Sequence, residues 1–179
     1  MNKLLEIRDI AVLEGANVTA FHAANAEGTF RYHHGTWALR DRFVGGDWMV
    51  NRSNGVETIR NEVLKLAIGF CNVDLACVDR YDPQPRTKKG NGAARAASPG
   101  LFEHLPKYVP GIPREWQFFY LMVDDKGAAE LSRPVLEAGR FIAMIERLYL
   151  AHGSDDGSTI RVLDVPDTGQ DFDPQIVRK

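Results

Sequence analysis

The first region with a clear pattern alternates aromatic runs with glycines. Residues 28–52 read GTFRYHHGTWALRDRFVGGDWMVNR, with glycines at positions 28, 35, 45 and 46. Aromatic and β-branched runs punctuated by glycine are typical of short antiparallel strands joined by tight turns. Gly45 and Gly46 supply the positive φ angles that a tight hairpin requires. The pattern therefore predicts strands near 29–33, 36–43 and 47–51.

Two later segments show the apolar spacing of amphipathic helices. In residues 53–70 apolar side chains recur three or four positions apart, and Asn54 followed by Glu57 matches a capping box. Residues 137–153 show a similar spacing and end at Gly153, a common residue after a helix C-terminus. The apolar positions of these two predicted helices are Val56, Ile59, Val63, Leu66 and Phe70, then Phe141, Ile142, Ile145, Leu148 and Tyr149.

The other apolar runs favour strands. Residues 72–81 are apolar on both faces, which predicts a central strand, and Pro83 ends it because proline cannot donate to a ladder. Residues 116–135 predict a hairpin whose DDKG turn places Gly127 in a left-handed conformation. The weaker patterns predict a short helix followed by a strand at 18–22 within 4–24, one or two helical turns at 101–108, and a last strand within 154–165.

Together these elements predict a single domain over residues 1–165. Hairpins with two interspersed helices indicate the α+β class, with a mostly antiparallel sheet built from hairpins and two main amphipathic helices. Residues 82–100 are expected to form a flexible basic loop, because long connections without regular structure are usually functional or disordered. Residues 166–179 are expected to form a polar C-terminal tail.

The composition favours a cytoplasmic protein with a packed core. Apolar residues make up 44% of the 179 positions, which is enough for a packed core. No apolar run approaches the roughly 18 residues that span a bilayer, so no membrane contact is expected. The N-terminus is charged too early for a signal peptide, which predicts a cytoplasmic protein. Cys71 and Cys77 lie in apolar surroundings and are interpreted as buried reduced thiols.

Positive charge is concentrated in the middle of the chain. The net charge is −2 overall, but it is −2 over residues 1–30, +4 over 31–95 and −4 over 96–179. Residues 85–100, PRTKKGNGAARAASPG, carry four cations and no acid among small residues that let a ligand approach the backbone. This combination suits phosphate oxygens, so the leading hypothesis is a binding or regulatory module for nucleic acid or another polyanion. The residues assigned to phosphate contact are Arg86, Lys88, Lys89 and Arg95, and the basic surface is extended by Arg31, Arg40 and Arg42.

Two alternative functions stay open at this stage. The first is a metal-dependent phosphodiesterase or nuclease of the PD-(D/E)xK type, in which carboxylates and a lysine flank the scissile phosphate. Its candidate residues are Asp74, Asp79, Asp124 and Lys126, although the last two fall in the predicted hairpin turn. The second is a protein–protein module or homo-oligomer that uses the aromatic hairpin 116–135. No motif indicates a catalytic triad, a cofactor or a dedicated metal site, so none of these is expected.

Overall fold

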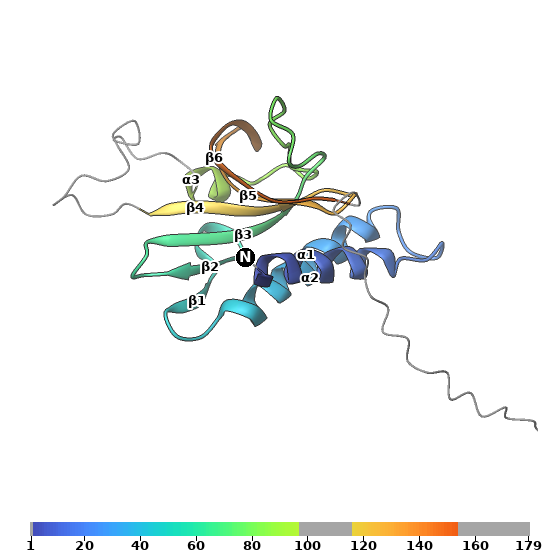
Figure 1. Ribbon diagram of the computed structural model, residues 1–179, viewed down its shortest axis with the longest axis horizontal. Coiled ribbons are helices and arrows are strands. Elements are labelled where there is room, and N and C mark those ends of the chain that lie inside the picture. The colour runs from blue at the N-terminus through green and yellow to red at the C-terminus, as the bar shows by residue number, and fades with distance from the viewer. Residues whose placement is uncertain (1, 97–115, 154–179) are drawn as a thin grey trace, which may run out of the picture.

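The computed structural model describes residues 2–96 and 116–153, and it belongs to the α+β class, as predicted. Two long helices come first in the chain and a six-stranded sheet follows (Figure 1). No helix in the described ranges is long and apolar enough to cross a membrane. The elements are α1 (Asn2–Ala16), α2 (Ala26–Phe43), β1 (Trp48–Asn51), the 3-10 turn η1 (Ser53–Gly55), β2 (Thr58–Asn61), β3 (Leu66–Asn72), α3 (Asn91–Ala96), β4 (Gln117–Val123), β5 (Ala128–Glu137) and β6 (Arg140–His152).

The strands lie in the sheet in the order in which they occur in the chain. Strands β1 to β3 form one antiparallel meander and β4 to β6 form another. The two meanders meet at β3 and β4, which pair in parallel from Leu66 opposite Gln117 to Asn72 opposite Val123. A parallel pair needs a long crossover connection, and this connection leaves β3 at Val73.

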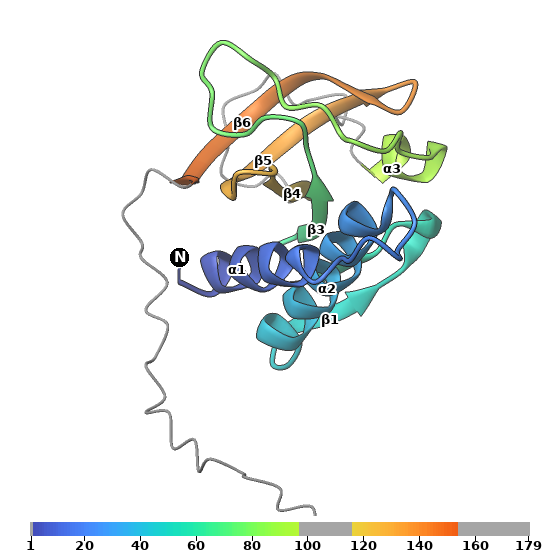
Figure 2. The ribbon, with the colours of Figure 1, turned by 90° about the vertical axis from the view of Figure 1, so that its right-hand side faces the viewer.

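Helices α1 and α2 lie side by side and cover one face of the sheet (Figure 2). Alternate residues of β3 and β4 point toward them, which places Phe70 and Leu121 in the same buried cluster as Ile7 and Leu39 of the helices. Phe70 packs directly against α2 at Gly35, where a side chain would collide with its ring. The apolar cluster between the helices and the sheet therefore depends on a glycine in α2 that faces an aromatic ring of β3.

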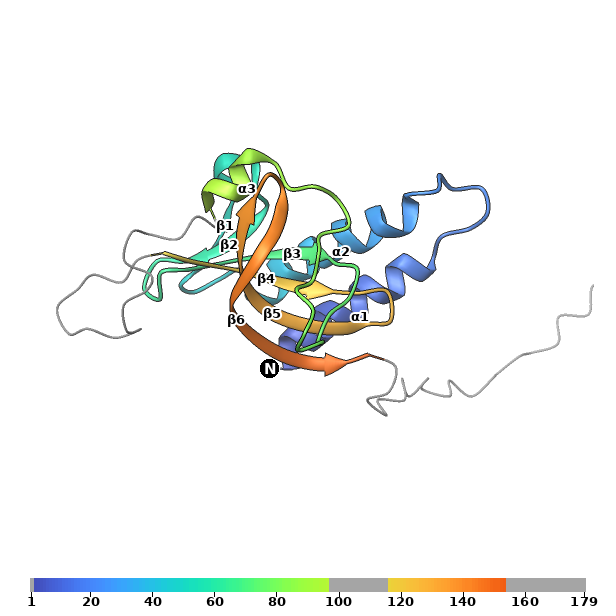
Figure 3. The ribbon, with the colours of Figure 1, turned by 90° about the horizontal axis from the view of Figure 1, so that it is seen from above.

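The other face of the sheet is covered by the chain that follows β3 (Figure 3). Its apolar cluster joins Cys71 and Tyr120 of the sheet to Ala76 of this connection and Ala93 of α3. Both cysteines are buried and free, which confirms the prediction for them.

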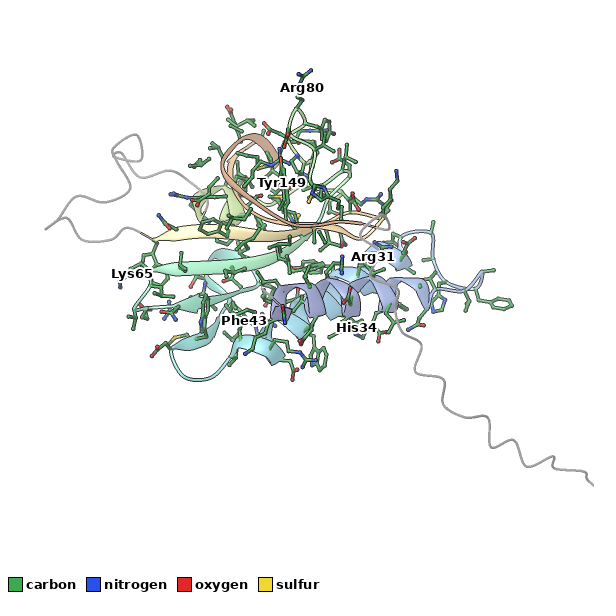
Figure 4. All side chains as sticks on the ribbon, in the orientation of Figure 1. Arg31, His34, Phe43, Lys65, Arg80 and Tyr149 are labelled. Carbon is green, nitrogen blue, oxygen red and sulfur yellow. The ribbon has the colours of Figure 1, made fainter. Side chains whose placement is uncertain are left out.

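A fully buried carboxylate holds this connection in place. Glu130 of β5 accepts hydrogen bonds from the Arg147 guanidinium, from the Ser132 hydroxyl and from the backbone N–H of Cys77. Arg147 also donates to the carbonyls of Val78 and Tyr81. In Figure 4 Tyr149 lies beneath this connection and Arg80 points away from its tip. A buried charge requires partners of this kind, because an uncompensated one is costly.

The strands predicted at 29–33 and 36–43 are wrong, because this region forms α2. Its buried residues include Arg31, Gly35, Ala38 and Leu39, which recur at helical spacing. The aromatic residues favour strands in the sequence. In the structure Gly35 is a packing site of the helix, and Gly28 lies in its first turn. The strand predicted at 18–22 also does not form, while the short helix before it is present as α1.

The two segments predicted from apolar spacing to form the main helices form strands instead. Residues 53–70 contain the hairpin of β2 and β3, whose turn is closed by the Asn61 side chain and by Lys65 in a left-handed conformation. Residues 137–153 form β6, which pairs with β5 through several register shifts. Each bulge breaks the two-residue alternation, and the resulting spacing resembles that of a helix. The strand predicted at 72–81 is also wrong beyond Asn72, where β3 ends.

Several local predictions are confirmed. The hairpin at 116–135 is present as β4 and β5, with Gly127 at a φ of 81°. The strand near 47–51 is β1, and Gly45 and Gly46 both have positive φ. The predicted helical turn at 101–108, the strand within 154–165 and the tail at 166–179 lie outside the described residues.

Two glycines of α2 form a matched pair that tests the core between α2 and β3. An added Cβ at Gly35 would lie 2.5 Å from the Phe70 ring, whereas one at Gly28 would meet no atom within 4 Å. We expect Gly35→Ala to lower the free energy of unfolding by about 1–2 kcal/mol, since overpacking outweighs the gain in helix propensity. Gly28→Ala should leave it unchanged or raise it by about 0.5 kcal/mol. Urea denaturation measures both changes, and equal stabilities would contradict the packing described.

Candidate ligand-binding cavity

A cavity opens along the edge of β3 that faces away from β4. Pairing with β2 ends where Thr58 lies opposite Gly69. The crossover connection then returns to the same edge, where the Arg86 N–H donates to the carbonyl of Asn72. Between these two pairings lies a hollow of about 540 Å³, which Phe70 and Asn72 help to line. The cavity thus occupies the gap between β2 and the returning chain.

Three further segments enclose this cavity. The first turn of α2 contributes Gly28, the residues before β2 contribute Val56, and the segment from Arg86 to Ala93 forms the opposite wall. An added Cβ at Gly28 or at Gly90 would meet no atom within 4 Å, so these glycines leave open space. The volume falls in the range of roughly 300–1,000 Å³ that is usual for small-ligand sites.

The turn between β5 and β6 positions the wall that carries the lysines. The Lys89 N–H donates to the carbonyl of Gly139 at 3.0 Å. Ala138 and Gly139 both have positive φ, and an added Cβ at Gly139 would lie 2.6 Å from the Lys89 carbonyl oxygen. Glycine is therefore required for this close approach.

Lys89 places its ammonium group among aromatic rings inside the cavity. Its Nζ lies 5.1 Å from the centre of the Tyr120 ring and 6.0 Å from that of Tyr32. Its positive charge acts on the nearby Cys71 thiol and partly offsets the effect of burial on the pKa of that group. Burial raises the pKa of Cys71 and that of Tyr120, so both groups are neutral at neutral pH. Neither group neutralises the lysine.

The acids of the cavity are already paired with arginines. Glu27 forms an ion pair with Arg31. Glu57 pairs with Arg40 and with Arg52, and its hydrogen bond to Arg40 lowers its pKa. Within residues 2–96 and 116–153, no carboxylate pairs with Lys88 or Lys89, so these two cations carry the excess charge.

The structure brings together only part of the predicted basic surface. Arg86, Lys88 and Lys89 line the cavity, but the Arg86 guanidinium pairs with Asp125. Arg95 is exposed on α3 and does not line the cavity. The described residues 82–96 make several backbone hydrogen bonds, and the flexibility expected of 82–100 stays a prediction.

The three N-terminal arginines of the predicted surface serve internal contacts. Arg31 is buried and donates to the carbonyls of Asp124 and Asp125, where α2 meets the β4–β5 turn (Figure 4). The other two form ion pairs, Arg40 with Glu57 and Arg42 with Glu6 and Asp41.

Two of the acidic residues considered for a nuclease, Asp124 and Asp74, serve local structure. Asp124 is buried and accepts hydrogen bonds from the backbone N–H groups of Ala76, Lys126 and Ala128, which closes the β4–β5 turn. Asp74 accepts from the Tyr81 hydroxyl and from the N–H of Gln84. Asp79 and Lys126 are both exposed. The part of the chain that the structure describes contains no group of three His, Cys, Asp or Glu side chains that could hold a metal ion.

The aromatic hairpin is used mainly inside the chain. Strand β4 lies between β3 and β5, and all its residues from Phe118 to Val123 are buried. Half of them pack toward the helices and half toward the crossover connection. Trp116, just before the strand, is 43% exposed. Residues 118–123 therefore offer no free surface to a partner.

No sequence pattern marks Asn72 or Tyr120 as part of a site, and Tyr32 falls in the strand predicted at 29–33 although it belongs to α2. Asn72, the last residue of β3, is the first residue of the strand predicted at 72–81. Tyr120 was recognised as part of a strand, but no local pattern relates it to Lys89. Only the folded chain brings these residues together.

Gly139 provides a test of how the lysine-bearing wall is positioned. Gly139→Ala should displace Lys89, because the new Cβ would meet its carbonyl oxygen. Gly46→Ala is the control, since its φ of 55° is also left-handed but nothing lies within 4 Å. We expect hydrogen exchange at the Lys89 amide to become about tenfold faster in Gly139→Ala and to stay unchanged in Gly46→Ala. Similar exchange in both variants would show that the β5–β6 turn does not hold this segment.

Comparison of the sequence with models of known families and with curated proteins, and of the structure with solved structures, finds no match. The cavity and its charges are therefore the basis for assigning a function.

Proposed function

We propose that this protein is a binding module for a phosphate-bearing ligand of about nucleotide size. The ligand occupies the cavity beside β3 and places its phosphate at Lys88 and Lys89. The observation that carries the proposal is the charge of Lys89, an ammonium group within a cavity that no carboxylate of the described residues balances. This retains the phosphate contact expected from the sequence and assigns it to a cavity instead of an open surface.

A bound anion stabilises the charged Lys89 ammonium group more than the surrounding aromatic rings do. The ring faces of Tyr32 and Tyr120 attract the ammonium group, but such contacts contribute only about 0.5–2 kcal/mol and leave the charge in place. A phosphate oxygen forms a charge-assisted hydrogen bond with it, and these bonds are about twice as strong as neutral ones. The half-buried position of Lys89 further reduces screening by salt.

A nucleic-acid strand carries the same phosphate groups, so the proposal extends to a strand as the ligand. Strand binding requires that the exposed Arg95 also contact the backbone, as the sequence suggests. Homo-oligomer or partner contact through 116–135 and a cytoplasmic location stay predictions that rest on sequence alone.

Neutralising single lysines tests the proposal. Lys88→Gln and Lys89→Gln should each weaken the binding of pyrophosphate and of nucleoside monophosphates by about tenfold or more, because each removes a charge-assisted hydrogen bond. Isothermal titration calorimetry measures the affinities. Single-stranded oligonucleotides titrated at two salt concentrations show whether a strand binds, since each phosphate contact steepens the salt dependence.

Lys65→Gln is the matched control. Lys65 also lies over an aromatic ring, that of Trp116 at 5.2 Å, and it precedes β3 at the end far from the cavity (Figure 4). Unlike Lys88 and Lys89, it pairs with a carboxylate, that of Glu62, which also pairs with Arg60. Its replacement should leave phosphate affinity unchanged. Equal losses in the Lys65 and Lys89 variants, or no phosphate binding by the unmodified protein, would refute the proposal.

A further inference from the structure

Asn72 has an unsatisfied acceptor at the cavity. Its side-chain N–H donates to the carbonyl of Gly28 at 2.8 Å, which fixes the orientation of the amide group. Its Oδ1 is buried and has no hydrogen-bond partner among the described atoms. Asn72 lines the cavity together with Tyr32 and Phe70.

A buried acceptor without a partner is unfavourable, and most such atoms in folded proteins are satisfied. The Asn72 amide cannot rotate to relieve this without losing its bond to Gly28. Because Asn72 lines the cavity, a small movement of the cavity wall on binding would bring Oδ1 within reach of a donor on the ligand.

The surroundings of Asn72 favour a planar donor. The Tyr32 side chain is half-buried at the cavity, and tyrosine faces are common platforms for stacking nucleobases. Aromatic groups and a fixed acceptor thus occur in the same cavity as the lysines that we assign to phosphate.

We infer that the ligand is a nucleotide whose base donates an N–H hydrogen bond to Oδ1 of Asn72. The inference rests on the proposed function, because it names the ligand that the phosphate site holds. Asn72 is then a specificity-determining residue: it selects for a base that carries a donor. Lys88 and Lys89 bind the phosphate whatever the base.

The base itself provides the sharpest test. All four natural nucleoside 5′-monophosphates carry an N–H donor on the base, whereas purine riboside 5′-monophosphate has a base without one and ribose 5-phosphate has no base. Titration calorimetry should show that at least one natural nucleotide binds about tenfold more tightly than purine riboside 5′-monophosphate. Ribose 5-phosphate should bind more weakly than either, since it cannot stack.

Asn72→Ala then separates recognition of the base from recognition of the phosphate. This variant should remove the preference over purine riboside 5′-monophosphate and keep the affinity for ribose 5-phosphate within about twofold, which also shows that the cavity is folded. Lys89→Gln should weaken all the ligands together and preserve the preference.

The outcomes distinguish the two proposals. If all the compounds bind equally and depend on Lys89, or if Asn72→Ala keeps the preference, the inference about the base is wrong and the phosphate site stands. If neither pyrophosphate nor any nucleotide binds, both proposals fail.

Discussion

The parallel pairing of β3 with β4 is the constraint on which the rest of the structure depends. Two parallel neighbours cannot be joined by a tight turn, so the chain must leave β3 and travel back before β4 begins. Its described part, from Val73 to Ala96, covers one face of the sheet and rejoins the free edge of β3 at Arg86. The cavity exists because β2 and this returning chain share one edge of β3 with a gap between them.

Arginines and lysines have different roles in this arrangement. The arginines that the structure places at the cavity wall or behind it, among them Arg31, Arg40 and Arg86, bind carboxylates and carbonyls of the protein itself. A planar guanidinium with five donors suits such internal contacts. Lys88 and Lys89 each carry a single ammonium group and remain without a carboxylate partner in the described part of the chain. The internal pairs thus leave the positive charge at the part of the wall that can meet a ligand.

Sequence patterns predict structural features that depend on neighbouring residues, but they do not predict features formed by residues that are distant in the sequence. The hairpin of β4 and β5 and the basic segment at 86–89 follow from local signals, namely a turn glycine between apolar runs and adjacent cations. The sequence of α2 predicts strands because its aromatic residues outweigh its helical spacing. Helical spacing in 137–153 was misleading because bulges shift the alternation of β6. The cavity itself depends on pairs such as Asn72 with Gly28 and Lys89 with Gly139, which no local pattern reveals.

The proposed function requires that Lys88 and Lys89 together form an anion site. The most direct measurement is NMR spectroscopy of the lysine side-chain methylene groups next to the ammonium during titration with inorganic phosphate. We expect the signals of Lys88 and Lys89 to shift along one saturating curve, while those of Lys3, Lys65 and Lys126 barely move. Small, unsaturated shifts of similar size at these five lysines would contradict it, because they would reflect ionic strength alone.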